Sequence, residues 1–305
     1  MLHENIIQGI INKIEDLNKN PAKERDNVFH IISELNDFIY SDKELTEEEI
    51  QKLIGELTFF TTLIPIPVPL GMDISRAVRY EDDGVVVPCY NEISRLSYIP
   101  ESMIEEKAKL GRMNQLKEPM FYGCLYTNPN SIGTALSEVN AQKNENFNVL
   151  FSKTKSTLQL IPIGVFDNYR RGIEHLWKLH GSFKDIYDLY KLHTHPSAMI
   201  ALHLCDAFLY KVLKEKSTEK LYRVTSQIAK ECLSAPIIDG LIYASVQFDN
   251  HPNIVIKPKS IDAKVAHKEV ISLEVIENYG YGIYQTKNTH HAYINDNKID
   301  WKEIK

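Results

Sequence analysis

A run of alternating prolines divides this chain more firmly than any other feature of its sequence. In Pro65-Ile66-Pro67-Val68-Pro69-Leu70 every second residue is a proline. Proline has no backbone N–H to donate, and its ring clashes with the preceding helical turn, so no helix crosses this segment. The same missing donor disfavours a central strand. We therefore expect a linker here, which separates an N-terminal segment, residues 1–64, from the remaining residues, 65–305.

The N-terminal segment has the apolar spacing of amphipathic helices. Apolar residues recur at intervals of three and four, which places them on one helical face. Asn20-Pro21 marks a break between a first stretch and a second. Thr46 with Glu49 three residues later has the pattern of a capping box, which predicts a third helix through Leu57. This helical extension is either a subdomain packed on the core or a module for dimerisation or inhibition.

The rest of the chain mixes strand-like and helix-like segments. Strands are predicted over 74–80, 120–126, 147–151, 158–165, 241–248 and 253–256, and helices over 131–140, 173–192, 198–214 and 221–233. The tail, 270–305, contains several short strand-like runs around Gly280 and Gly282. The fold class expected from this order is α+β.

Composition sets limits on the protein class. The 305 residues are 43% hydrophobic and 25% charged, which suits a soluble globular protein with a substantial core. A net charge of −6 gives no reason to expect nucleic-acid binding. The N-terminus lacks the features of a signal peptide, and the longest apolar run is too rich in proline to span a membrane. We expect a cytoplasmic protein without a membrane partner.

The cysteines and histidines do not predict a metal site. Cys89, Cys124, Cys205 and Cys232 are scattered without a CxxC spacing, which fits reduced thiols. His193-Thr194-His195 is an HxH with Asp206 downstream as a candidate third ligand, but Pro196 follows at once. That context is more typical of a loop with exposed imidazoles, so no metal is expected.

Five polar side chains have the chemistry of a nucleotide site. Arg76 and Arg112 suit a phosphate, because a guanidinium donates two parallel hydrogen bonds. Tyr122 can stack on a flat base, with Tyr80 and Tyr126 as alternatives. Glu138, in a helix expected to direct it inward, can stabilise developing positive charge, and the Ser245 hydroxyl can hold a ribose or phosphate. Arg79 competes with Arg76, since strand alternation places only one of them toward a pocket.

The order of these residues resembles the RES-domain family. The matching pieces are Ile74-Ser75-Arg76-Ala77-Val78-Arg79, Gly111-Arg112-Met113-Asn114, Pro119-Met120-Phe121-Tyr122, Thr134-Ala135-Leu136-Ser137-Glu138-Val139, Asp239-Gly240-Leu241-Ile242-Tyr243-Ala244-Ser245-Val246 and Asn253-Ile254-Val255-Ile256. The resemblance covers roughly residues 70–260, within a catalytic domain of residues 65–305. It implies an ADP-ribosyltransferase-like core with a split β-sheet, preceded here by the helical extension.

The resemblance also implies a function. Family members consume NAD, cleaving the nicotinamide–ribose bond as a glycohydrolase, phosphorylase or ADP-ribosyltransferase, and act as toxins of toxin–antitoxin pairs. By this resemblance Arg76 and Arg112 clamp the pyrophosphate, Tyr122 contacts nicotinamide, and Glu138 and Ser245 are catalytic. NAD is then a substrate, with no separate cofactor, and the expected partners are a helix-turn-helix antitoxin and a second copy of the chain. The alternative is a catalytically silent module that binds a nucleotide or a protein.

Overall fold

The computed structural model describes residues 4–81, 89–125, 131–173, 182–216, 218–245, 252–295 and 298–304, and its contacts divide the chain into two compact units. The first unit consists of residues 1–66, 110–115 and 161–235. The second consists of residues 67–109, 116–160 and 236–305. The N-terminal helices therefore share a unit with residues 161–235, which the sequence pattern had grouped with the C-terminal part of the chain.

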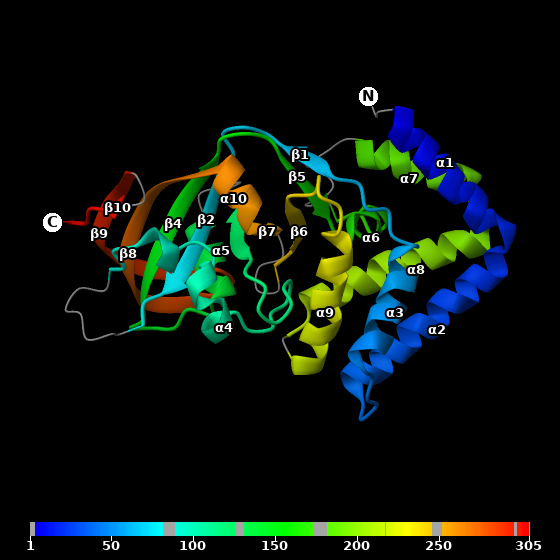
Figure 1. The fold of residues 1–305 in the computed structure, drawn as a ribbon, viewed down its shortest axis with the longest axis horizontal. Coiled ribbons are helices and arrows are strands. Elements are labelled where there is room, and N and C mark those ends of the chain that lie inside the picture. The colour runs from blue at the N-terminus through cyan, green and yellow to red at the C-terminus, as the bar shows by residue number, and fades with distance from the viewer. Residues whose placement is uncertain are drawn as a thin grey trace. The chain divides into compact units, whose positions relative to one another are not determined.

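The first unit is helical, and its amphipathic helices bury their apolar faces against one another. Its helices are α1 (Glu4–Lys19), α2 (Pro21–Tyr40), α3 (Glu47–Thr58), α6 (Val165–Arg170), α7 (Ser182–His193), α8 (Pro196–Lys214) and α9 (Glu219–Cys232). Helix α2 packs on α8, α3 on α9, and α1 on α7 (Figure 1). Of the predicted helix over 173–192, residues 174–181 lie outside the described part of the chain.

Helix α8 passes a length and hydropathy test for a membrane span, within the described residues. More than half of its apolar window, 56%, is buried inside the protein, as in the core helix of a globular fold. Residues such as Ala201, Cys205 and Leu209 are fully buried in this helix. Its apolar character is therefore used for packing among the other helices of the unit.

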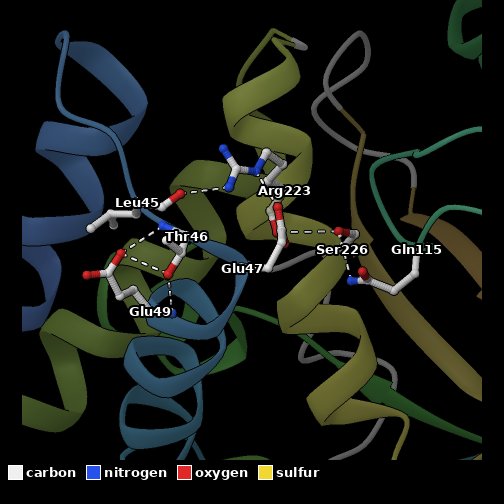
Figure 2. Close-up of polar contacts among 7 residues, drawn as sticks. All are labelled: Leu45, Thr46, Glu47, Glu49, Gln115, Arg223 and Ser226. Carbon is white, nitrogen blue, oxygen red and sulfur yellow. Dashed lines mark hydrogen bonds and ion pairs between the residues drawn. The ribbon is translucent and has the colours of Figure 1, made fainter.

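Polar contacts fasten the beginning of α3 to α9. Thr46 caps α3 with a complete capping box, in which the Glu49 carboxylate accepts a hydrogen bond from the Thr46 backbone N–H at 2.7 Å. Arg223 of α9 donates to the Leu45 carbonyl at 2.7 Å and to the Glu47 carboxylate at 2.5 Å (Figure 2). One turn further along α9, Ser226 accepts from the Gln115 amide at 3.0 Å, so residues 110–115 belong to this unit.

Most strands of the chain belong to the second unit and form one sheet. The strands are β1 (Ile66–Val68), β2 (Asp73–Arg79), β3 (Phe121–Leu125), β4 (Asn146–Thr154), β5 (Leu158–Pro162), β6 (Gly240–Ala244), β7 (Pro252–Ile256), β8 (Val265–Gly280), β9 (Ile283–Asn295), β10 (Lys298–Ile299) and β11 (Lys302–Glu303), and the unit boundary falls within β1 and β5. Among the described residues the strand order is β1-β5-β6-β7-β3-β2-β4-β8-β9-β10, and β11 also pairs with β9. The short helical segments are η1 (Ile93–Arg95), η2 (Glu101–Met103), α4 (Ile104–Lys107), α5 (Ser131–Glu138) and α10 (Pro258–Lys264). The chain is thus of mixed α and β structure, in agreement with the expected α+β class.

The proline-rich segment is only partly a linker. Residues 66–68 form β1 at one end of the strand order, with Pro67 exposed between two buried neighbours. An edge position tolerates proline because the missing donor faces no further strand. The sequence excluded a central strand here correctly, but it did not predict this edge strand.

The C-terminal tail forms a long hairpin instead of the short runs expected. Strands β8 and β9 have 16 and 13 residues, and their register shifts at three places along the pair. Each shift interrupts the two-residue alternation by which a strand is recognised in a sequence, so one long strand resembles several short ones. At the hairpin turn, Gly282 approaches α5 so closely that a Cβ on Gly133 would lie 2.1 Å from the Gly282 carbonyl oxygen. This contact fixes α5 against the hairpin.

Asp239, just before β6, forms hydrogen bonds with β5 and α10. Its carboxylate accepts from the Gln159 backbone N–H at 2.7 Å, the Ser260 hydroxyl at 2.7 Å and the Lys264 ammonium at 2.6 Å. Next to it, a Cβ on Gly240 would lie 2.0 Å from the Val255 carbonyl oxygen, so only glycine allows β6 and β7 to approach here. These contacts set the position of β6, which leads to Tyr243 and Ser245.

A buried carboxyl group lies in the helical unit. Asp206 of α8 accepts from the Asp167 backbone N–H at 2.6 Å, at the beginning of α6. Burial, with the nearby Asp167 carboxylate as a smaller contribution, raises the pKa of Asp206 to about 7. Arg170 and Arg171 both pair with Asp167 at 2.6 Å, which leaves Asp206 without an ion pair among the described residues. Asp206 therefore accepts a hydrogen bond from the first turn of α6.

We predict that Asp206 makes stability depend on pH. A carboxyl whose pKa is raised by folding binds more protons in the native state, so its contribution is complete below about pH 4 and declines as pH rises to about 7. The decline is at most about 1.4 kcal/mol for each pH unit. The substitution Asp206→Asn keeps an acceptor for the Asp167 N–H but removes the titrating group. Urea unfolding between pH 4.5 and 7.5, in ordinary buffers, should show a flatter profile for this variant than for the parent.

The exposed Asp37 of α2 offers the matched control for this measurement. Asp37→Asn should leave the pH profile of the parent unchanged. If the free energy of unfolding varied with pH equally in the parent and in Asp206→Asn, Asp206 would not be the source of the pH dependence.

Candidate functional site

A cavity of about 270 Å³ lies in the second unit, where α5 covers β2 and β3. Its lining includes three residues expected from the sequence, Arg76, Tyr122 and Glu138. They come from β2, β3 and the last residue of α5, and Ser245 joins them through a contact with Glu138. The fold thus gathers four of the five expected site residues, which are separated by up to 169 positions in the chain.

The cavity begins where two strands part. Among the described residues, β2 pairs with β3 through Ile74 and Ser75, while its pairing with β4 continues as far as Arg79. At the point of separation, the Arg76 guanidinium donates to the backbone carbonyl of Tyr122 at 2.7 Å. Its centre also lies 5.3 Å from the Phe121 ring centroid, within the range of a cation–π contact. The side chain of Arg76 therefore supplies a hydrogen bond between β2 and β3 beyond the end of their backbone pairing.

Arg76 places a poorly solvated positive charge at the cavity. Burial lowers its pKa to about 10, so the guanidinium remains protonated at neutral pH. Its Nε is buried without a hydrogen-bond partner, and within the described ranges the guanidinium forms no ion pair. A partly buried cation lacking an anionic partner loses some of its solvation, and an anion in the cavity would offset that loss.

Glu138 and Ser245 form a pair across the site. The Ser245 hydroxyl donates to Glu138 Oε1, and Ser245 itself is fully buried. Glu138 was expected to point inward, but it is exposed at the end of α5 while still lining the cavity. Because Glu138 is the last residue of α5, its carboxylate remains in contact with solvent, and it needs no cationic partner to offset a loss of solvation. The result is an ionisable carboxylate held by one hydroxyl and accessible to a ligand.

The aromatic and arginine alternatives are resolved by their contacts. Arg79 points away from the cavity lining, with Nη2 at 3.2 Å from the Glu145 carboxylate and its guanidinium near the Phe147 ring. Tyr80 packs against Tyr90 with ring centroids 5.0 Å apart, and Tyr126 lies outside the described residues. Of the two expected tyrosines that the structure describes, Tyr122 lines the cavity.

Arg112 has a different setting, in the first unit. Its guanidinium donates to the carbonyls of Leu213 and Glu215 at 2.8 and 2.9 Å. These carbonyls belong to the C-terminal turn of α8, where backbone acceptors have no partner within the helix. A cation there also interacts favourably with the helix dipole. In this structure Arg112 therefore acts as a side-chain cap of α8.

Polar residues of the cavity that the sequence did not single out form a row across the sheet. Tyr243 pairs with Asn253, Asn253 with Cys124, and Cys124 with Ser75, on the successive strands β6, β7, β3 and β2. All four side chains are buried and line the cavity. Asn253 and Ser75 stand out as polar residues within apolar strand runs, and that signal in the sequence could have identified them.

Comparisons with protein-family models, with curated proteins and with solved structures gave no match.

We predict that Arg112 contributes mainly to stability. Arg112→Ala removes both hydrogen bonds from the end of α8 and should lower the free energy of unfolding by about 1–3 kcal/mol. Equilibrium denaturation measures this loss, and Arg25→Ala, which removes a surface ion pair, serves as the control. A free energy of unfolding equal to that of the parent would contradict the capping role. Normal stability combined with a loss of NAD affinity above tenfold would instead support the phosphate clamp expected from the sequence.

Proposed function

We propose that this chain is an NAD-consuming enzyme that cleaves the bond between nicotinamide and ribose. The observation that carries the proposal is the meeting of Arg76, Tyr122, Glu138 and Ser245 at one cavity. These residue types were selected from the sequence for their chemistry toward a dinucleotide. They come from β2, β3, α5 and the residue after β6. Their positions in the chain alone would not bring them together.

The charges of the site suit this substrate. Arg76 is a partly buried cation with no carboxylate partner in the described part of the chain, which favours an anionic ligand such as a pyrophosphate. Binding there would supply the counter-charge that the protein does not provide. Tyr122, on the same wall, presents a ring on which a flat pyridine base can stack.

Glu138 is proposed to stabilise the transition state of the reaction. As nicotinamide leaves, positive charge develops on the ribose, as in glycoside hydrolysis. An ionised carboxylate stabilises that charge in the transition state without requiring a metal. Ser245, bonded to one oxygen of Glu138, would hold the carboxylate in a single orientation and leave its second oxygen for the substrate.

The size of the cavity limits what it encloses. Pockets that bury a drug-sized ligand usually measure roughly 300–1,000 Å³. At about 270 Å³, this cavity suits the nicotinamide and its ribose better than a complete dinucleotide. The adenosine half would then extend beyond it. The acceptor of the ADP-ribose is water, phosphate or a protein side chain.

The remaining parts of the proposal follow from the RES-domain resemblance. The second unit would be an ADP-ribosyltransferase-like core, in which the short β2–β3 pairing corresponds to the split of the sheet. The protein would act in the cytoplasm as the toxin of a toxin–antitoxin pair, restrained by a helix-turn-helix partner, and would assemble with a second copy of itself. NAD would be the substrate, with no other cofactor.

We predict that Glu138→Gln abolishes most turnover while preserving binding. The amide keeps the shape of the side chain and can still accept from Ser245, but it carries no charge to stabilise the transition state. The turnover number should fall on the order of 10²–10³, with little change in the Michaelis constant. The measurement is the release of nicotinamide from NAD, with water, phosphate or protein as the acceptor.

The exposed Glu56 of α3 gives a charge-matched control, since Glu56→Gln changes the net charge equally outside the site. Parental turnover in folded Glu138→Gln would exclude the mechanism. If the parent binds NAD but leaves it intact with every acceptor, the protein is the silent binding module that the sequence left open.

A second prediction concerns Ser245→Ala. This change removes the hydroxyl that orients Glu138 but leaves its charge, so turnover should fall less than in Glu138→Gln, by roughly tenfold. The Glu138→Gln/Ser245→Ala double variant should then be no slower than Glu138→Gln alone, because the hydroxyl acts only through the carboxylate. Independent, multiplicative losses in the nicotinamide-release assay would show that Ser245 contacts the substrate by itself.

A further inference from the structure

The floor of the cavity contains a hydrogen-bond donor that the fold leaves without an acceptor. Asn253 of β7 is only 1% exposed, and its Nδ2 has no hydrogen-bond partner among the described residues. Leaving an amide N–H₂ buried and unpaired is unfavourable, and native structures contain few such groups. Because Asn253 also lines the cavity, a bound ligand is the natural source of the missing acceptor.

The orientation of the amide is determined by its neighbour. Cys124, directly opposite Asn253 on β3, donates its thiol hydrogen to Asn253 Oδ1 at 3.3 Å. Burial, followed by the charge of Glu138, raises the pKa of this thiol well above its ordinary value, so the sulfur carries its hydrogen. Sulfur is a weak acceptor, and therefore the reverse orientation of the amide, with Nδ2 toward Cys124, would leave Oδ1 without a comparable donor.

The side chains directly beside Asn253 in the sheet are uncharged. Its neighbours in the cross-strand row are Tyr243 and Cys124, both uncharged and buried. The positive charge of the cavity belongs to Arg76, on a different strand. A phosphate would therefore bind near Arg76, whereas a carbonyl oxygen on an aromatic ring suits Asn253.

We propose that Asn253 is the residue that recognises the base, donating from Nδ2 to the carboxamide oxygen of the nicotinamide group. The inference rests on the proposed function, because it identifies which part of the substrate occupies the floor of the same cavity. Asn253 is then a specificity-determining residue, distinct from the five residues that the sequence singled out. Cys124 is a positioning residue that keeps the amide in its donating orientation.

Small pyridines that the enzyme cannot cleave test this assignment directly. Nicotinamide and 3-acetylpyridine both carry the ring carbonyl oxygen, while pyridine lacks it. Ligand-observed NMR titrations of the full-length parent should give nicotinamide and 3-acetylpyridine affinities roughly fivefold to tenfold higher than pyridine, the scale of one hydrogen bond. Equal affinities for the three ligands, or no binding of nicotinamide, would overturn the proposal without the use of any variant.

Variants of Asn253 then locate the effect. In Asn253→Ala and in Asn253→Val, which suits a strand, the preference for the carbonyl-bearing ligands should shrink to less than twofold. Asn168→Ala is the matched control, because Asn168 is another fully buried asparagine with unpaired side-chain atoms, located in the helical unit. A preference that persists in either folded Asn253 variant would also overturn the proposal.

The Cys124 variants test the positioning role. Cys124→Ser keeps a donor toward Oδ1 and should retain the preference, whereas Cys124→Ala should reduce it. An unchanged preference in Cys124→Ala would remove Cys124 from the proposal.

Assays with NAD itself separate this inference from the proposed function. Nicotinamide release from NAD, combined with a carbonyl preference independent of Asn253, would leave the enzyme in place and exclude the base-recognition role. An Asn253-dependent preference without NAD cleavage or NAD binding would keep the carboxamide site and exclude the proposed reaction.

Discussion

The antiparallel register of β6, β7, β3 and β2 is the constraint on which the site depends. Directly opposed residues on neighbouring antiparallel strands point to the same face of a sheet, with Cα atoms about 4.5–5.5 Å apart. The register therefore places Tyr243, Asn253, Cys124 and Ser75 in one row beneath α5. A slip of one residue in any of these pairs would move a polar group out of the cavity and an apolar one into it. Asp239 and Gly240 fix that register at the start of β6.

The electrostatics of the site follow from where this sheet opens. Because the described pairing of β2 and β3 ends at Ser75, the Arg76 guanidinium occupies the gap and is a partly buried cation. The opposite charge, on Glu138, is kept at the solvated end of α5 and is held by Ser245. The protein thus separates its cation from its carboxylate instead of pairing them. Such an arrangement is costly for stability and suits a ligand that carries anionic and developing cationic groups.

Packing outside the cavity holds α5 in place. The β8–β9 turn approaches Gly133 at backbone distance, and the Ser137 hydroxyl contacts both the Gly133 carbonyl and the Tyr284 hydroxyl. Asn278 of β8 donates to the Ala141 carbonyl just beyond the helix, at 3.0 Å. The β8–β9 hairpin, which was predicted from the sequence as several short strands, therefore supports α5, the helix that ends in Glu138.

The sequence alone determined the local structure of this protein. Apolar periodicity and the Thr46–Glu49 capping box predicted α1 to α3, since these signals arise within one helix. The resemblance to the RES-domain family, together with side-chain chemistry, pointed to Arg76, Tyr122 and Glu138, and these residues line the cavity. Tertiary structure decided the rest. It assigned Arg112 to the end of α8, chose Arg76 over Arg79, and placed Asn253 beside Cys124. Those outcomes depend on pairing between strands and helices distant in the chain, and local patterns carry no information about which partner each will meet.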